Sequence, residues 1–295
     1  MMPTPLKWES AKPEELLAIK GVCLDIDDTL STHGKLTAEA YAALWKLKQA
    51  GFAVVPVTGR PAGWCDHIAR FWPVDAVVGE NGAFTFYMDR SSSGASGAQS
   101  ILRRLDTPGG EPNASKRRAR LEALGAAIRS RFPHARWASD QAYREFDLAI
   151  DFCEDVLKWS DEDVQELVKL CGTEGAHAKV SSIHVNAWFG EYDKWGGFEY
   201  WVQSGFPGLE GGAARYGLGK QEPRKEWLFI GDSPNDEPLF RRFDATVGVA
   251  NLKRFLPDLK HPPRWMTSEI SGSGFAQMAE RLCFARGLVD PSRKT

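Results

Sequence analysis

The sequence is poor in cysteine and lacks the spacing that a cysteine framework needs. Five cysteines occur in 295 residues, an odd number, and no two of them form a Cys-x-x-Cys pair. They are Cys23, Cys65, Cys153, Cys171 and Cys283. This usage argues against a disulfide scaffold and against a structural zinc site. We expect reduced, buried thiols in a cytoplasmic protein.

The sequence also lacks long apolar runs and an excess of charge of either sign. No stretch of about 18 apolar residues is present, so no membrane span is predicted. The first residues, MMPTPLKWES, lack the apolar core of a signal peptide. Lys and Arg number 37 and Asp and Glu number 39, for a net charge of −2. This balance gives no electrostatic case for a nucleic acid or an anionic membrane as partner. It leaves the oligomeric state open.

Short apolar runs that end abruptly in polar residues are the main structural signal. Such runs occupy residues 21–24, 52–57 and 76–78, with a helical pattern over 37–50 between the first two. Similar runs return at 227–230, 245–249 and 264–267, before a closing helix from about Gly274. Alternating strands and helices are typical of a parallel sheet with crossover helices. We therefore predict an α/β fold.

A different pattern interrupts this arrangement. Helical spacing covers residues 115–131 and 160–170, and strand-like patterns cover 135–138, 145–152, 176–180 and 182–188. The order αββαββ predicts an antiparallel sheet with helices on one face. We predict a discontinuous core of residues 1–104 and 191–295 and an inserted α+β cap of residues 105–190. The Ser/Gly-rich residues 91–100 are expected to form a hairpin tip.

Charged residues follow several of the core strands. Asp25 and Asp27 follow the first strand, and Asp232 and Asp236 follow the strand at 227–230. In open α/β sheets, ligands bind outside the carboxyl ends of the strands. Carboxylates placed together need a cation, and oxygen-only ligands suit Mg²⁺. Taken alone, each of these segments is an ordinary turn or helix cap; their joint order favours a site.

These residues resemble the motifs of the haloacid dehalogenase superfamily, in its subfamily IIB, the Cof-like and sugar-phosphate phosphatase branch with a large α/β cap. Asp25-Ile26-Asp27-Asp28-Thr29 resembles the first motif, and Val57-Thr58-Gly59-Arg60 the second. Lys194 resembles the third, and Gly231-Asp232-Ser233-Pro234-Asn235-Asp236 the fourth. Gly79-Glu80-Asn81-Gly82-Ala83 is similar to the branch's Asn-Gly-Ala segment. The resemblance implies a parallel, Rossmann-like core. Many members have Gly where this chain has Asp28.

The resemblance implies a role for each of these residues. Asp25 would attack phosphorus and form an aspartyl-phosphate, and Asp27 would act as general acid and base. Thr58 and Lys194 would hold the phosphoryl group and its charge. The implied Mg²⁺ ligands are Asp25, the backbone of Asp27, Asp232 and Asp236. The implied activity is hydrolysis of a phosphomonoester, with a small phosphorylated metabolite as partner.

Alternation in the cap strands adds a hypothesis about the substrate. His184, Asn186 and Trp188 share one face of their strand, and Ile183, Val185 and Ala187 share the other. An open polar surface of this kind suits a sugar phosphate, with Gly59, Arg60 and Asn81 contributing from the core. A merely solvated sheet face is the alternative. A sugar phosphomutase and a catalytically silent sugar-phosphate-binding protein are the competing functions.

Overall fold

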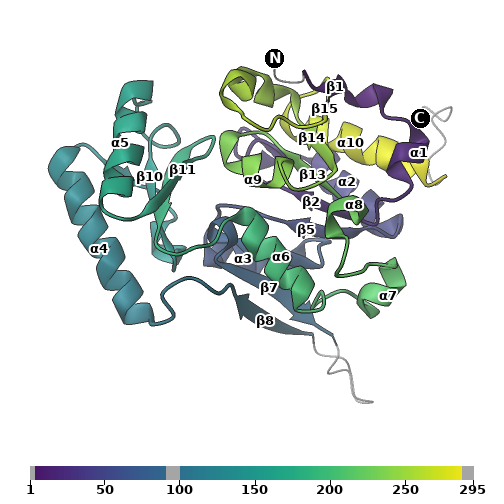
Figure 1. Cartoon of the computed structure of the whole chain (residues 1–295), viewed down its shortest axis with the longest axis horizontal. Coiled ribbons are helices and arrows are strands. Elements are labelled where there is room, and N and C mark those ends of the chain that lie inside the picture. The colour runs from purple at the N-terminus through teal and green to yellow at the C-terminus, as the bar shows by residue number, and fades with distance from the viewer. Residues whose placement is uncertain (1–3, 91–99, 288–295) are drawn as a thin grey trace.

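The computed structural model describes residues 4–90 and 100–287 (Figure 1). The predicted hairpin tip at 91–100 therefore lies outside the described residues, apart from Ser100. Two bodies are visible in Figure 1: a layered α/β core that contains β1 and α10, the first and last labelled elements, and a smaller cap beside it. Within the described part of the chain, no helix is long and apolar enough to cross a membrane.

The core is a six-stranded sheet in which all neighbouring strands run parallel. Its strands, in spatial order, are β1 (Leu6–Lys7), β15 (Trp265–Met266), β14 (Ala245–Gly248), β13 (Trp227–Gly231), β2 (Gly21–Leu24) and β5 (Ala53–Pro56). The predicted fold class is confirmed. The adjacent central strands β2 and β13 are the two that lead into the acidic residues. The chain adds β5 on the outer side of β2, and it adds β14 and β15 on the outer side of β13, so the strand order reverses between β2 and β13.

Alternate side chains of the central strands face two separate apolar layers. Val22 and Leu24 of β2 pack with the helices α1 (Pro13–Leu16), α2 (Ala38–Gln49), α3 (Ala62–Phe71) and α10 (Ser271–Ala285). Cys23, between them, faces a layer rich in aromatic rings under α6 (Lys194–Gln203) and α9 (Glu237–Phe240). The short helices α7 (Gly212–Tyr216) and α8 (Pro223–Glu226) follow α6. Burial on both faces explains why these strands are uniformly apolar.

Beyond β5 the sheet continues through one bridge and then changes direction. β6 (Ala76–Gly79) lies beside β5 through a parallel Val57–Val78 bridge. It then pairs antiparallel with β7 (Phe84–Asp89), which pairs with β8 (Ile101–Asp106). A second, small hairpin of β3 (Ser31–Thr32) and β4 (Lys35–Leu36) follows β2 in the chain. We call this small hairpin the flap.

The cap has the predicted αββαββ order. Its elements are α4 (Ala114–Arg131), β9 (Arg136–Trp137), β10 (Asp147–Asp151), α5 (Asp161–Thr173), β11 (His177–Val180) and β12 (His184–Trp188). The sheet order is β11-β12-β10-β9, with antiparallel neighbours. Leu148, Ile150, Val185 and Ala187 pack under the two helices, as the alternation predicted.

Phe146, just before β10 in the same alternating segment, does not pack under the cap helices. It packs with the core cluster instead of the cap cluster, beside Phe84 at 5.9 Å between ring centroids. The Arg117 guanidinium lies 3.8 Å from its ring centroid, and Arg104 covers it at 5.1 Å. These cation–π contacts hold the ring at the boundary between cap and core.

The two connectors between core and cap are paired with each other. Gly110 of the outgoing connector and Gly190 of the returning connector form an antiparallel bridge. The Glu191 N–H also donates to the Gly109 carbonyl at 3.1 Å. The inserted elements run from α4 to β12. The exact limits of core (1–104 and 191–295) and cap (105–190) stay a prediction.

Candidate active site

Three buried carboxylates meet where β2 and β13 end. Asp25 directly follows β2, and Asp232 and Asp236 follow β13. One oxygen of each carboxylate lies within 4.8 Å of the others. Their side chains are almost fully buried. Three negative charges this close, out of reach of water, require cationic compensation.

Lys194 supplies part of that compensation. Its Nζ donates to Asp25 Oδ1 and to Asp236 Oδ1, each at 2.7 Å. The lysine is the first residue of α6, which the Asp193 side chain caps by accepting the Gly196 N–H at 2.7 Å. The cluster of four groups still carries two net negative charges when all are ionised.

Close backbone packing positions this lysine. Gly82, in the 3-10 turn η2 (Glu80–Gly82), has φ of +107° and lies directly against the start of α6. A Cβ at Gly82 would come within 1.9 Å of the Asp193 carbonyl oxygen. A Cβ at Gly197 would come within 2.7 Å of the Gly82 Cα. The two glycines therefore let the turn after β6 and the helix that carries Lys194 cross in contact.

Burial has the largest effect on the pKa values of the cluster, and the neighbouring charges have the second largest. Burial raises the pKa of Asp25 to about 8, and Lys194 opposes this rise while Asp236 adds to it. Burial also raises the pKa of Asp232 well above its ordinary value, with Asp25 and Asp236 contributing. Burial disfavours the ammonium form of Lys194, but Asp236 and Asp25 outweigh it and raise its pKa.

The donor set of this cluster fits a hard divalent cation. All donor atoms are carboxylate oxygens, the preferred ligands of Mg²⁺. Asp236 also orders the loop, because its Oδ2 accepts the N–H groups of Asp232 at 3.0 Å and Ser233 at 3.3 Å. Asn251 Nδ2 donates to Asp232 Oδ2 at 3.2 Å and fixes that carboxylate from the far side.

Asp27 points away from the acidic cluster and pairs with Arg60. The Arg60 Nη2 lies 2.7 Å from Asp27 Oδ1, and its Nε lies 3.0 Å from both oxygens. This geometry holds the carboxylate in a bidentate clamp. Burial opposes the charge on Arg60, but Asp27 and the cap carboxylates Glu154 and Asp140 outweigh it and raise its pKa.

The cap reaches Arg60 through two carboxylates. Asp140 Oδ2 lies 3.3 Å from Arg60 Nη1, and Glu154 Oε1 lies 3.5 Å from Nη2. Glu154 also pairs with His184 at 2.8 Å, and this contact lowers the pKa of Glu154 although burial opposes the shift. Arg60 is thus shared between a core carboxylate and two carboxylates of the cap.

A second contact fastens the cap to the core through Glu80. This buried carboxylate accepts the N–H groups of Ala62 at 3.0 Å, Glu145 at 3.0 Å, Phe146 at 2.5 Å and Asp147 at 3.2 Å. Burial and the nearby Asp147 raise the pKa of Glu80 to about 8, although Arg144 and these N–H groups favour the charged form. The chain entering β10 is therefore held directly on η2.

The structure brings most of the sequence-predicted residues to one place. Gly59, Arg60, His184 and Asn186 line a small pocket together with Asp25 and Asp27. Its volume is about 10 Å³, which leaves room for roughly one water molecule. Core and cap residues both line this small space, so they close around Asp25 and Asp27 in this arrangement.

Six predicted residues do not line that pocket. Three of them, Lys194, Asp232 and Asp236, belong to the acidic cluster, and the other three lie elsewhere. Thr58 is fully buried, and its Oγ1 accepts the Arg60 N–H at 3.0 Å, so it supports the loop that presents Arg60. Asn81 lies behind Gly59, with its Nδ2 3.5 Å from Asp147 Oδ2. Trp188 stacks near Tyr192, with ring centroids 6.1 Å apart, and donates to the Tyr192 carbonyl.

The predicted open polar face of the cap sheet is buried instead. Asp147 is fully buried, and Asn186 Nδ2 donates to its Oδ2 at 2.9 Å. Arg144 Nη1 donates to Asp147 Oδ1 and to the Gly59 carbonyl, both at 2.9 Å. Most polar groups on this face bind one another and the core, so only part of the face lines the pocket with Asp25 and Asp27.

Sequence reasoning missed several residues of the site. Asp140, Arg144 and Glu154 lie in cap loops that carry no motif and no alternation. Ser233 and Asn235 lie inside the fourth motif and line the small pocket, but their types alone did not single them out. Glu80 stands in the quoted Asn-Gly-Ala segment, and a Glu beside a predicted strand end was a usable signal for it.

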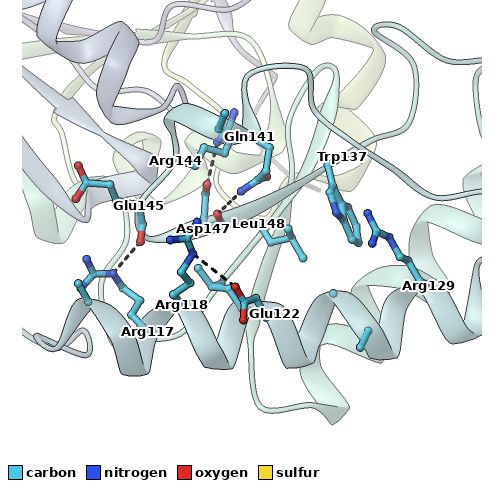
Figure 2. A pocket seen from close by; sticks show the side chains of 15 residues that line it. Arg117, Arg118, Glu122, Arg129, Trp137, Gln141, Arg144, Glu145, Asp147 and Leu148 are labelled. Carbon is cyan, nitrogen blue, oxygen red and sulfur yellow. Dashed lines mark hydrogen bonds and ion pairs between the residues drawn. The ribbon is translucent and has the colours of Figure 1, made fainter.

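A wide groove of the cap is not part of this site. Figure 2 shows it between α4, which carries Arg117, Arg118, Glu122 and Arg129, and the segment with Trp137 and Gln141. It has a volume of about 720 Å³. Arg144 lines both this groove and the small pocket beside Asp25, but none of the three clustered carboxylates lines the groove.

The sequence comparisons agree with the motifs. Residues 22–95 match the family model of haloacid dehalogenase-like hydrolases. No curated protein sequence matches the chain.

Several solved structures share the fold. A putative HAD/COF-like hydrolase from Plasmodium vivax is 17% identical with a TM-score of 0.61, over 92% of this chain and 99% of that one. The sucrose-phosphatase from Synechocystis sp. PCC6803 is 15% identical with a TM-score of 0.57, over 90% and 98%. A HAD subclass IIB sugar phosphatase is 13% identical with a TM-score of 0.57, over 91% and 99%. The resemblance drawn from the motifs is thereby confirmed: the chain has the fold of the haloacid dehalogenase-like hydrolases, and its first motifs match that family.

Proposed function

We propose that this protein is a Mg²⁺-dependent phosphatase that hydrolyses small sugar phosphates through an aspartyl-phosphate on Asp25. One observation carries the proposal: Asp25 lies in a buried cluster with Asp232 and Asp236, and Lys194 bridges Asp25 and Asp236. Asp27, two residues on, lies apart from the cluster and is held by Arg60. The proposed nucleophile, Asp25, thus lies among carboxylates and one lysine, whereas the proposed proton donor, Asp27, lies against an arginine.

The chemistry follows from these two settings. Asp25 attacks phosphorus, and the bond from phosphorus to the ester oxygen breaks while Asp27 protonates that oxygen. Asp27 then takes a proton from water, which attacks the aspartyl-phosphate and releases inorganic phosphate and free Asp25. Lys194 holds Asp25 on the side from which it attacks and offsets charge on the transferring group. Asp25, Asp232 and Asp236 would hold the Mg²⁺, which would supply charge neutralisation for the phosphoryl oxygens.

The other site residues take supporting roles in this proposal. Arg60 positions Asp27, and Thr58 fixes the loop that carries Arg60. Gly59 and His184 lie at the catalytic pocket and contact the substrate, whereas Asn81, Asn186 and Trp188 support the walls. The proteins of similar fold that are named sucrose-phosphatase and sugar phosphatase favour a sugar phosphate as the substrate class.

The test is a phosphate-release assay over sugar phosphates, nucleotides and phosphorylated acids, with Mg²⁺ and with EDTA. We expect release of inorganic phosphate from sugar phosphates only with Mg²⁺, and none from the Asp25→Asn variant. Isomerised sugar phosphate without phosphate release would instead identify a phosphomutase. A correctly folded protein that turns over no ester would favour the silent binding protein.

A further inference from the structure

A second, larger pocket lies directly beside the catalytic one. It has a volume of about 450 Å³, within the range of small-molecule sites. Its core side is formed by Asp28 and by His33 and Lys35 of the flap. Its cap side is formed by Cys153 and Glu154. We call this space the flap pocket.

The position of the flap pocket matches the geometry of phosphoryl transfer. Asp27 and Arg60 line both pockets, whereas Asp25 lines only the small one. In an in-line displacement, the attacking and leaving oxygens lie on opposite sides of phosphorus. The leaving oxygen must also lie against the group that protonates it. An ester with phosphorus beside Asp25 therefore directs its leaving group past Asp27 and into the flap pocket.

We propose that the flap pocket, and not the polar face of the cap sheet, binds the leaving group, and that it selects a neutral, hydroxyl-rich one. This inference rests on the proposed phosphatase function and goes beyond it by naming the specificity site. The volume accommodates a leaving group of monosaccharide to disaccharide size.

The charges around the flap pocket explain why it would select a neutral leaving group. Asp27 and Asp28 are half-buried on its inner side, whereas His33 and Lys35 are exposed at its mouth. Glu154 adds a third carboxylate from the cap. The Arg60 guanidinium also lines this inner end, but it already pairs with Asp27 and Glu154, so the carboxylates outnumber it. Carboxylates accept hydrogen bonds from sugar hydroxyls, and they disfavour a second anion close to the ester. The inner end of the flap pocket is therefore suited to hydroxyl groups and unsuited to a carboxylate or second phosphate.

Two of the three polar side chains on the alternative specificity surface are already hydrogen-bonded within the protein. Asn186 is committed to Asp147, and Trp188 is committed to the Tyr192 carbonyl. His184 pairs with Glu154, so this imidazole reaches the flap pocket only through that carboxylate. The flap pocket, in contrast, is open space bordered by polar groups.

A matched pair of substrates and two bulky variants test the inference. Glycerol 3-phosphate and 3-phosphoglycerate have the same number of carbons, but the second carries a carboxylate near the ester. We expect kcat/KM of the wild-type enzyme to favour glycerol 3-phosphate by about 10-fold or more, because like charges oppose each other in the flap pocket. Acetyl phosphate, whose leaving group is too small to fill the flap pocket, measures the phosphoryl-transfer machinery separately.

Filling the flap pocket is the second arm. We expect Cys153→Phe to lower the ratio of kcat/KM for hexose 6-phosphate to that for acetyl phosphate by about 10- to 100-fold. Lys35→Trp does the same from the flap side and replaces Cys153→Phe if that variant melts early. Cys153→Ser separates the lost thiol from the added bulk and lowers the ratio by less than about 3-fold. Arg118→Ala, in the outer groove of the cap, is the neutral control.

The outcomes separate the two proposals. A wild-type enzyme that hydrolyses neither a phosphate ester nor the acyl phosphate acetyl phosphate overturns the proposed function and the flap pocket with it. An enzyme that cleaves acetyl phosphate and hexose phosphate, but keeps its ratio in both bulky variants, overturns the flap pocket alone. Preference for 3-phosphoglycerate, or a selective loss seen only in Asn186→Ala, also overturns it.

Discussion

Replacing Asp25 by Asn is expected to abolish turnover and yet to stabilise the protein in the absence of a divalent cation. Asp25 is buried against Asp232 and Asp236, with Lys194 as the single cation paired to the cluster within the described residues. Asn has nearly the same shape and removes one of the three negative charges. Lys194 keeps its 2.7 Å contact with Asp236 in the variant.

The pKa of Asp25 sets the size and sign of this effect. Its ordinary value of 3.8 rises to about 8 in the folded protein, mainly through burial. Between these values the folded state binds a proton that the unfolded state has lost, so stability falls as pH rises. One such group lowers the free energy of unfolding by about 1.4 kcal/mol per pH unit in this window. From pH 5 to pH 7 the loss is on the order of 3 kcal/mol, and Asp25→Asn does not undergo it.

Thermal unfolding in EDTA, followed from about pH 5 to pH 8, measures this difference. We expect the melting temperature of the variant to exceed that of the wild type increasingly as pH rises, by several degrees near neutrality. Mg²⁺ should narrow the gap, because it binds the folded wild type more tightly. Asp66→Asn, at an exposed ion pair with Arg70, is the matched control and should follow the wild-type curve. Parallel curves for wild type and Asp25→Asn would refute the reasoning.

Other consequences concern the contacts that hold the site. Lys194→Met leaves the buried carboxylates unpaired and should cost about 3–5 kcal/mol in urea unfolding without metal; a loss below about 1 kcal/mol would contradict the assigned pairing. Gly82→Ala should cost at least about 2 kcal/mol and lower activity, because the new methyl group meets the Asp193 carbonyl. Gly172→Ala, in α5 with open space around it, should be neutral or stabilising by up to about 1 kcal/mol. Glu80→Ala should cost at least about 3 kcal/mol, since several buried N–H groups lose their acceptor; an unchanged midpoint would show that the cap does not depend on this residue.

The strands of the core could be predicted because both of their faces are buried. β2 and β13 are apolar runs of four and five residues, each followed at once by an acidic loop. That pattern predicted that Asp25 and Asp232 would be neighbours, and the structure places them so. The sequence did not predict the order of the strands in the sheet. The strands β1 and β15, at one end of the sheet, are only two residues long, which is too short for a recognisable pattern of apolar residues.

The contacts between cap and core were beyond sequence reasoning. Arg60 and Asp140 are 80 residues apart, and Glu80 and Phe146 are 66 apart. Each of the charged residues Arg60, Asp140 and Glu80 could be an ordinary surface residue until the docking of the cap on the core is known. The same docking buries Asn186, which alternation alone had assigned to an open face. Periodicity reports which face of an element is apolar, but not what covers the polar face.

The bridge between Gly110 and Gly190 gives the cap the character of a detachable module. The chain leaves the core and returns to it within one hydrogen-bonded pair of residues, so the gap left by removing the insertion is short. Closing a short gap costs little loop entropy. A different insertion could be joined at this same junction while the strands that carry Asp25 and Asp232 keep their register, so the chemistry and the choice of substrate can change independently.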